Sequence, residues 1–353
     1  MTDVLHTADI HLRAGDRTRL AGLEAVLEKA EELDVELLTI AGDLFDGGED
    51  VDALRHELRN RLFTDLPFEI LLIPGNHDVR AFREDLFFGE ACTVIAEEEH
   101  FGEWTNEDRS LSISAIPYRE ELTDDLVAAL HDRSSSGDMD VLLFHGSLDA
   151  PMGADSGDET DYRYFPVAEE ELLDLGFDVY LAGHYHSPHL RRLDNGAEFA
   201  YPGTPVSTRR SEVGRRQVVL FDGDRGLSFE ALDTPHYLDH RVTVSPGRET
   251  ETIQDIEAWV STHVSDSSIP RIVVDGVVDV PEAEFAEKLA TVVETDWVTS
   301  NWLSVDHITH HPVIEAFENQ LDERSWDERT KEAVRTRTLR AASTVAAMGP
   351  EWR

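Results

Sequence analysis

Apolar residues along the first part of the chain follow two alternating spacings. Apolar positions three and four apart lie on one face of a helix, whereas a short continuous apolar run is typical of a buried strand. The helical spacing occurs at 20–30, 51–62 and 169–176. The strand-like runs lie at 35–43, 68–73, 141–144, 178–183 and 217–221. Helices interleaved with strands predict a layered α/β domain whose sheet faces are both covered.

A second, smaller α/β pattern begins after the proline-containing stretch 233–247. Strand-like and helical segments alternate as βαβαβ at 241–244, 252–264, 271–278, 282–293 and 302–309, and further helical segments lie at 313–321 and 329–340. The stretch 153–161, rich in Gly, Asp and Ser, is expected to be an exposed loop. We therefore predict a domain over residues 1–235, a small α/β domain over 236–312 and a helical C-terminal segment over 313–353.

The composition favours a soluble cytoplasmic protein without a membrane partner. The hydrophobic content of 41% is that of a globular protein, and no stretch approaches the roughly 18 apolar residues of a membrane-spanning helix. The N-terminal residues MTDVLHTADIHL lack the basic region and cleavage site of a secretory signal. The single cysteine, Cys92, can form no internal disulfide, which fits a reducing compartment and argues against a thiolate-based metal site.

The net charge is strongly negative. The formal charge is −42, and only three of the 31 basic residues are lysines. Concentrated salt screens the resulting repulsion, because the Debye length is only about 3 Å at 1 M salt. We interpret the chain as halophilic. The alternative, an acidic disordered protein, is disfavoured because the acidic residues are spread through well-patterned apolar segments.

Polar residues gather where the predicted strands end. The apolar run at 68–73 continues into Pro74 and Gly75 and is followed by Asn76, His77 and Asp78. Other strand ends carry Asp9 and His11 in TADIHL, Asp43 in AGD, His145 in FHG, and His184 and His186 in AGHYH. Ligands of α/β sheets bind at the carboxyl ends of strands, so we expect these groups to converge on one crevice.

The residue types indicate a divalent metal site. Carboxylate, imidazole and amide ligands without thiolate suit Mn²⁺, Fe²⁺ or Zn²⁺ better than Ca²⁺. The D-x-H and H-x-H spacings would place two ligands on one side of an extended backbone. Seven or eight candidates exceed the four to six ligands of one ion, whereas two ions about 4 Å apart, bridged by a carboxylate, would use them all.

Each part of this pattern also has an ordinary interpretation. A lone D-x-H or G-D at a strand end is more often a turn or a helix cap. A lone histidine is usually a solvated or hydrogen-bonded side chain. We interpret the remaining histidines in that way: His6, His56, His100, His131, His189, His236, His240, His263, His307, His310 and His311. The complete ordered set favours the metal site over coincidence.

The ordered series D-x-H, GD, GNHD, H and GHxH resembles the calcineurin-like metallophosphoesterase superfamily. The resemblance implies a two-layered β-sandwich flanked by helices, an α/β fold that holds a dinuclear centre. It implies that one metal is bound by Asp9, His11, Asp43 and His186 and the other by Asp43, Asn76, His145 and His184. Asp43 would then bridge the metals, His77 would be the catalytic histidine, and Asp78 would be the acid that orients it.

Within this superfamily the chain is similar to the SbcD exonucleases and the Mre-type nucleases of double-strand-break repair. The similarity rests on LHTADIHL, GDLFD, IPGNHD, FDVYLAGHYHSPH and YPGTPVSTRRSE, across roughly the first 230 residues. It implies a small capping domain, which residues 240–310 fit in size and pattern. It further implies Mn²⁺ as the favoured metal, with Fe²⁺ or Zn²⁺ as alternatives, an SMC-like ATPase partner and a homodimer. Many archaeal members carry a histidine where this chain has Asp46.

Three functions remain open at this point. The first is a two-metal DNA exonuclease or endonuclease of break repair, acting on DNA ends, hairpins or single strands. The second is a small-molecule phosphodiesterase or phosphatase, and the third is a catalytically silent scaffold for DNA ends or an ATPase. The arginine pairs 191–192, 209–210 and 215–216 could contact phosphates or be solvated surface. The basic segment 329–340 is interpreted as a surface helix, with a DNA- or partner-facing role as the alternative.

Overall fold

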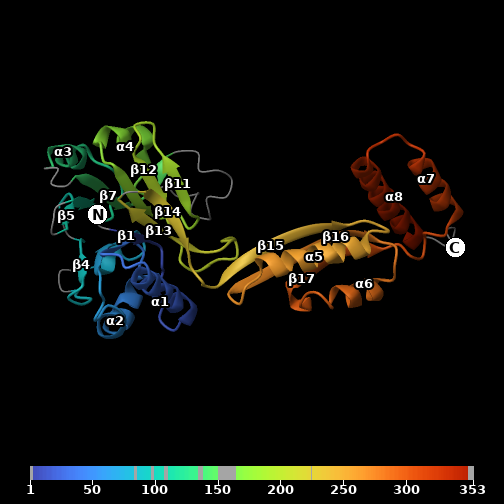
Figure 1. Cartoon of the computed structure of the whole chain (residues 1–353), viewed down its shortest axis with the longest axis horizontal. Helices are drawn as coiled ribbons and strands as arrows, with labels where there is room; N and C mark the ends of the chain where they lie inside the picture. The colour runs from blue at the N-terminus through green and yellow to red at the C-terminus, as the bar shows by residue number, and fades with distance from the viewer. Residues whose placement is uncertain are drawn as a thin grey trace. The chain divides into compact units, whose positions relative to one another are not determined.

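The chain divides into two compact units, Met1–His236 and Tyr237–Arg353 (Figure 1). The computed structural model describes residues 3–82, 86–96, 99–106, 110–133, 138–149, 164–223 and 225–348. The stretch 153–161, expected to be an exposed loop, lies outside the described residues. Within the part that the structure describes, every helix is too short or too polar to cross a membrane.

The first unit contains two six-stranded mixed sheets. In spatial order the first sheet consists of β14 (Gly226–Ala231), β13 (Gln217–Asp222), β1 (Val4–Thr7), β2 (Leu37–Ala41), β3 (Glu69–Ile73) and β4 (Cys92–Val94). The second consists of β11 (His189–Arg192), β12 (Glu198–Tyr201), β10 (Val179–Gly183), β7 (Met139–His145), β6 (Leu111–Ala115) and β5 (Gly102–Thr105). Strands β1 to β4 are parallel, as are β6, β7, β10 and β12.

Helices cover the outer face of each sheet. They are α1 (Arg17–Glu32), α2 (Gly48–Glu57) with a π-helical turn over Leu58–Leu62, α3 (Asp124–Asp132) and α4 (Glu169–Leu175). The short strands β8 (Leu148–Asp149) and β9 (Val167–Ala168) pair with each other in parallel. Helix α1 begins where Asp16 accepts hydrogen bonds from the Thr18 and Arg19 backbone N–H groups.

Alternating side chains of the strands build separate apolar layers. Leu38 and Ile40 of β2 pack in one cluster with Leu23 of α1. Leu37 and Ala41, on the opposite face of the same strand, pack in a second cluster with residues of β7 and β10. Helices α3 and α4 cover the outer face of the second sheet in the same way (Figure 1). The predicted fold class, an α/β two-layered β-sandwich flanked by helices, is confirmed.

The second unit is built on a three-stranded sheet. Its elements are β15 (His236–Val244), α5 (Glu249–His263), β16 (Ser268–Val278), α6 (Glu282–Leu289), a 3₁₀ turn (Thr295–Trp297) and β17 (Val298–Ser304), followed by α7 (Pro312–Asp322) and α8 (Glu328–Met348). Ile256 of α5 and Phe285 of α6 pack on this sheet. Ile314 of α7 and Leu339 of α8 form another cluster with Val277 of β16. The last two helices therefore pack within this unit.

The basic segment 329–340 makes its described contacts within its own unit. Arg335 pairs with Glu318 and Asp322, at 2.7 and 3.1 Å. Arg340 donates a hydrogen bond to the Gly276 carbonyl at 3.1 Å. These contacts fix the segment, as part of the surface helix α8, to α7 and β16.

Candidate metal centre

The candidate site residues leave the carboxyl ends of five strands of the first unit. Asp9 and His11 follow β1, Asp43 follows β2, Asn76, His77 and Asp78 follow β3, His145 ends β7, and His184 and His186 follow β10. Backbone contacts join these ends: Asp9 N–H donates to Gly42 O at 3.1 Å, and His11 N–H donates to Asp43 O at 2.9 Å. His184 N–H donates to the Asp9 carboxylate at 2.9 Å and so links the two sheets. All of them are buried except Asn76, which is half-buried, and His77, which is exposed.

Four of these residues have a left-handed backbone. The φ angles are 54° at Asp9, 50° at His11, 50° at Asp43 and 111° at His184. Such angles are uncommon outside glycine and gather at functional sites, where the surroundings hold the strain. The expectation that D-x-H and H-x-H place ligands by strand alternation is therefore wrong. Left-handed residues after β1, β2 and β10, and not an extended backbone, aim these side chains.

One group of ligand atoms surrounds the imidazole of His11. Its Nε2 lies 3.2 Å from Nε2 of His186 and 3.8 Å from Oδ2 of Asp43. Ligand atoms of Asp9, His11 and His186 all lie within 4.8 Å of one another. Two ligand atoms about 2.1 Å from one ion at tetrahedral or octahedral angles would be about 3.0 to 3.4 Å apart. The spacing of the two imidazoles fits a shared cation.

A second group lies around His145. Its Nε2 is 2.9 Å from Oδ1 of Asn76 and 3.5 Å from Oδ2 of Asp43. Oδ2 of Asp43 therefore faces imidazoles of both groups, as a bridging ligand would. The ring of His184 lies beside that of His145, with centroids 5.4 Å apart. Among the described residues, however, His184 belongs to none of the three-residue groups whose ligand atoms lie within 4.8 Å.

Hydrogen bonds at Nδ1 of His145 and His186 leave Nε2 of each ring as an acceptor. Nδ1 of His145 faces the Ala41 carbonyl at 2.8 Å, and Nδ1 of His186 faces the Glu212 carboxylate at 2.7 Å. Carbonyl and carboxylate oxygens only accept, so in the neutral form of either ring the hydrogen lies on Nδ1. The lone pairs on Nε2 then point at carboxylate, amide or imidazole acceptors. Acceptors that converge without donors fit a divalent cation.

Burial shifts the pKa of an imidazole ligand and of a carboxylate ligand in opposite directions. It lowers the pKa of His11 well below its ordinary value, and the neighbouring His186 lowers it further. Burial also raises the pKa of Asp43, against the opposing effect of His77. The imidazole is therefore neutral, which is its metal-binding form, while a cation beside Asp43 would favour the carboxylate.

The structure assigns the orientation of His77 differently from the sequence interpretation. The Asp78 carboxylate accepts the backbone N–H groups of Gly75 (2.8 Å) and Phe45 (3.1 Å), so it fixes the loop. Nδ1 of His77 instead donates to the Asp46 carbonyl at 3.2 Å, and its backbone N–H donates to Oδ1 of Asp43 at 2.9 Å. The prediction that Asp78 orients His77 is thus corrected. The ring of His77 stands 4.8 Å from that of His11, in a T-shaped arrangement.

The fold and the geometry of the site agree with a comparison of the sequence with models of known protein families. Residues 2–188, more than half of the chain, match the model of the calcineurin-like phosphoesterase family. The chain belongs to this family. The matched range includes every candidate ligand from Asp9 to His186. The protein is therefore a metal-dependent phosphoesterase with a candidate dinuclear site.

Two curated relatives resemble this phosphoesterase over about two thirds of its length. The chain is 24% identical over 257 residues to the DNA double-strand break repair protein Mre11 of Methanopyrus kandleri, covering 63% of this chain and 54% of that protein. It is 24% identical over 263 residues to the uncharacterized metallophosphoesterase YhaO of Bacillus subtilis, covering 65% and 60%. The matches thus span less than two thirds of either relative.

A solved structure with a similar chain path is TT1561 of Thermus thermophilus. It aligns with a TM-score of 0.42 at 14% identity and covers 65% of this chain and 98% of that chain.

Two groups beside the phosphoesterase site, Asp46 and Glu212, were not among the predicted site residues. The Asp46 carboxylate lies 3.6 Å from Nδ1 of His11 and accepts a hydrogen bond from Arg19 at 2.6 Å. Glu212 contacts His186, and hydrogen bonds from His186 and Thr208 outweigh the effect of burial to bring its pKa to about 2. A signal for Glu212 was present, because it is the only acidic residue between positions 199 and 221.

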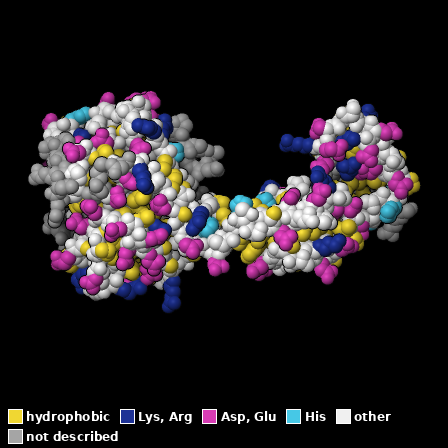
Figure 2. Space-filling view, in the orientation of Figure 1, with side chains coloured by type: hydrophobic (Ala, Val, Ile, Leu, Met, Phe, Trp, Pro, Cys, Tyr) yellow, Lys and Arg dark blue, Asp and Glu magenta, His cyan; other side chains and the backbone are white. Residues whose placement is uncertain are grey.

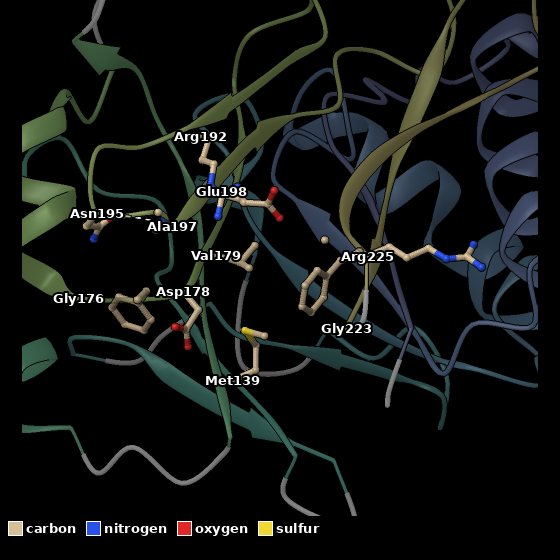
Figure 3. A pocket seen from close by; sticks show the side chains of 14 residues that line it. Met139, Gly176, Asp178, Val179, Arg192, Asn195, Ala197, Glu198, Gly223 and Arg225 are labelled. Atoms are coloured by element: carbon tan, nitrogen blue, oxygen red, sulfur yellow. Dashed lines mark hydrogen bonds between the residues drawn. The ribbon is translucent and has the colours of Figure 1, made fainter.

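The first unit also has a cavity at the opposite end of β7 and β10. Its volume is about 590 Å³, and its lining includes Met139 and Val179, the first residues of the two strands, together with Arg192, Glu198 and Arg225 (Figure 3). None of the candidate metal ligands lines it. The opposing charges on its walls give it no preference for a phosphate, so we do not connect it with the phosphoesterase chemistry.

Gly75→Ala should disrupt the site. A β-carbon at Gly75 would lie 2.1 Å from Oδ1 and 2.5 Å from the backbone N of Asp43, closer than real contacts allow. We expect a loss of about 1 to 3 kcal/mol in the free energy of unfolding and reduced metal content, measured by thermal denaturation and elemental analysis. Gly47→Ala is the matched control, because Gly47 has φ −170° and open space around it. Normal metal content in Gly75→Ala would contradict the role of this close approach.

Proposed function

We propose that this phosphoesterase is a two-metal DNA nuclease that acts on DNA ends, hairpins or single strands in double-strand-break repair. The observation that carries the reaction class is the position of Oδ2 of Asp43, 3.8 Å from Nε2 of His11 and 3.5 Å from Nε2 of His145. DNA as the substrate is supported by the likeness to a protein named as Mre11. Mn²⁺ is the metal that we propose, with Fe²⁺ or Zn²⁺ as alternatives.

In phosphodiester hydrolysis some of these side chains would bind the metal ions and His77 would act on the substrate. Asp9, His11 and His186 would hold one ion, Asn76, His145 and His184 the other, and Asp43 both. Two bound divalent ions would lower the pKa of water to about 7 and neutralise charge that develops on the phosphoryl oxygens. His77 is exposed and close to the ligands, and the Asp46 carbonyl holds its Nδ1–H. When the ring also carries a proton on Nε2, that N–H would stabilise the reacting phosphate or protonate the departing sugar oxygen.

Binding of DNA has to overcome an acidic surface. Figure 2 shows Asp and Glu side chains scattered over both units, with few Lys or Arg side chains among them. Counterion release contributes little at molar salt, so short-range contacts matter more. Of the paired arginines, Arg191 binds Glu169 at 2.6 Å and Arg216 is buried. Arg209 and Arg210 are exposed, in the loop that contacts His186 through Glu212.

An assay with four substrates tests the proposal. The protein in concentrated KCl with Mn²⁺ would be offered labelled linear DNA, hairpin DNA, a cyclic dinucleotide and an aryl phosphodiester. We expect turnover of DNA that a chelator removes and added Mn²⁺ restores. Turnover confined to the two small esters would replace the nuclease with a small-molecule phosphodiesterase. DNA binding without any turnover would indicate a scaffold.

The Arg209→Ala, Arg210→Ala double variant separates substrate binding from chemistry. We expect KM for DNA to rise about 2- to 30-fold, from about 0.2 to 1 kcal/mol for each exposed ion pair, while kcat stays unchanged. Hydrolysis of the aryl phosphodiester, which is too small to reach this loop, should keep its KM. Steady-state kinetics on both substrates would measure the difference. An Arg192→Ala, Arg225→Ala double variant serves as a control for simple loss of two charges, because both side chains are exposed at the far cavity. Equal effects on both substrates would refute a DNA contact.

A further inference from the structure

Glu212 lies beneath the candidate metal centre and touches one of its ligands. The side chain is only 3% exposed. Its Oε1 accepts a hydrogen bond from Nδ1 of His186 at 2.7 Å and another from the Thr208 hydroxyl at 2.7 Å. Its Oε2 accepts the Thr208 backbone N–H at 2.6 Å and the Thr204 hydroxyl at 3.1 Å. Both oxygens are thus used as acceptors, and a neutral amide could not replace them at every contact.

The loop that carries Glu212 is itself fixed. The buried guanidinium of Arg216 donates to the Thr204 carbonyl at 2.9 Å and also to the His186 carbonyl. The Ser207 hydroxyl donates to the Glu212 carbonyl at 2.7 Å. The positive charge of Arg216 offsets the buried carboxylate. The carboxylate therefore meets His186 from a rigid support that is held at both ends, as a group that orients a ligand requires.

We infer that Glu212 is a positioning residue, which holds His186 in the tautomer that presents Nε2 toward Asp9 and His11. This inference rests on the metal centre of the proposed function. A carboxylate on Nδ1 fixes both the ring orientation and the site of the proton, and it makes Nε2 a stronger ligand. The role is specific to one half of the site, because Nδ1 of His145 is held by the Ala41 carbonyl instead.

Glu212→Gln tests the inference directly. The amide of glutamine has a single oxygen. This oxygen is expected to stay with the Thr208 backbone N–H, because a backbone N–H cannot rotate toward another acceptor. The amide NH₂ group would then face Nδ1 of His186. This arrangement moves the imidazole hydrogen to Nε2 and blocks the ligand. We expect the affinity for one of two Mn²⁺ or Zn²⁺ equivalents to fall about 10- to 100-fold, with the other unchanged. Stepwise binding isotherms would measure both affinities, and ¹⁵N spectra of the metal-free protein would report the tautomer of His186.

Two further variants keep the test decisive. Glu198→Gln is the matched control, because Glu198 also accepts a backbone N–H, from Leu227 at 3.0 Å, but lies at the far cavity. Both of its metal affinities should be unchanged. If Glu212→Gln unfolds, Glu212→Asp keeps the charge beside Arg216 but shortens the reach toward His186, and the same affinity should fall.

The outcomes separate this inference from the proposed function. An unchanged tautomer, unchanged affinities or an equal fall of both affinities in the Glu212 variants would overturn the positioning role, while the wild-type site would still bind metal. A wild-type protein that binds no second equivalent would instead overturn the dinuclear centre itself.

Discussion

His77→Ala is expected to lower phosphodiester turnover by about 10²- to 10⁴-fold while the metal content remains that of the wild type. His77 is exposed, and its Nδ1 and backbone N–H are held by Asp46 and Asp43. The side chain can therefore be removed without opening the buried ligand set. Single-turnover kinetics and elemental analysis on the same preparation would measure both quantities.

The alternative for His77 is a ligand role, since its ring atoms lie within 4.8 Å of ligand atoms of His11 and Asp43. Loss of a metal equivalent in His77→Ala would establish that alternative and remove the catalytic assignment. His56→Ala is the control for loss of a histidine, because His56 is exposed in the last turn of α2. Its turnover and metal content should both be unchanged.

The convergence of the site residues could be predicted because it follows from topology. Parallel strands end on the same edge of a sheet, so polar residues that follow β1, β2 and β3 must meet. Most of the interior strands were equally clear, because their side chains are buried on both faces and leave uninterrupted apolar runs. These two rules account for the four central strands of the first sheet, β13, β1, β2 and β3, and for the two central strands of the second, β10 and β7, but not for β4 and β14.

The missed strands lack that signal. Strand β11 consists of half-buried or exposed residues, and strand β5 exposes part of its surface, so their sequences read as polar segments. Strand β6 is fully buried but carries Ser112 and Ser114 among its five residues. Short runs with polar residues do not differ from loops by pattern alone. The two-layered sandwich was therefore expected from the family resemblance and not from strand patterns.

The backbone angles and side-chain contacts of the site could not be predicted from sequence patterns. A D-x-H segment has the same spacing whether it is extended or left-handed, so the φ angle of 54° at Asp9 left no trace in the sequence. The contact of Asp78 with the Phe45 and Gly75 backbone depends on where two loops meet. The contact between Glu212 and His186 spans 26 residues. Such contacts follow from tertiary packing, which single-sequence patterns do not contain.

Asp43→Asn is expected to deplete both metals. Oδ1 of Asp43 accepts the His77 backbone N–H at 2.9 Å, while Oδ2 faces Nε2 of His11 and of His145. An amide has only one oxygen. If that oxygen stays with the His77 N–H, the NH₂ group points at the two imidazole lone pairs, and the negative charge shared by both ions is lost. The affinity for each ion should fall by more than the roughly 10- to 100-fold effect of an outer partner. Elemental analysis after dialysis at micromolar metal would measure it.

Asp34→Asn provides a close control for this substitution. Asp34 is exposed and has a φ of 53°, nearly the 50° of Asp43, so the same change of residue meets the same backbone conformation away from the ligands. The control should keep its full metal content and its melting temperature. If Asp43→Asn lost one equivalent and kept the other, Asp43 would belong to a single ion and the bridge would be disproved. If it kept both, the metals would have to lie away from Oδ2 of Asp43, the oxygen that faces both His11 and His145.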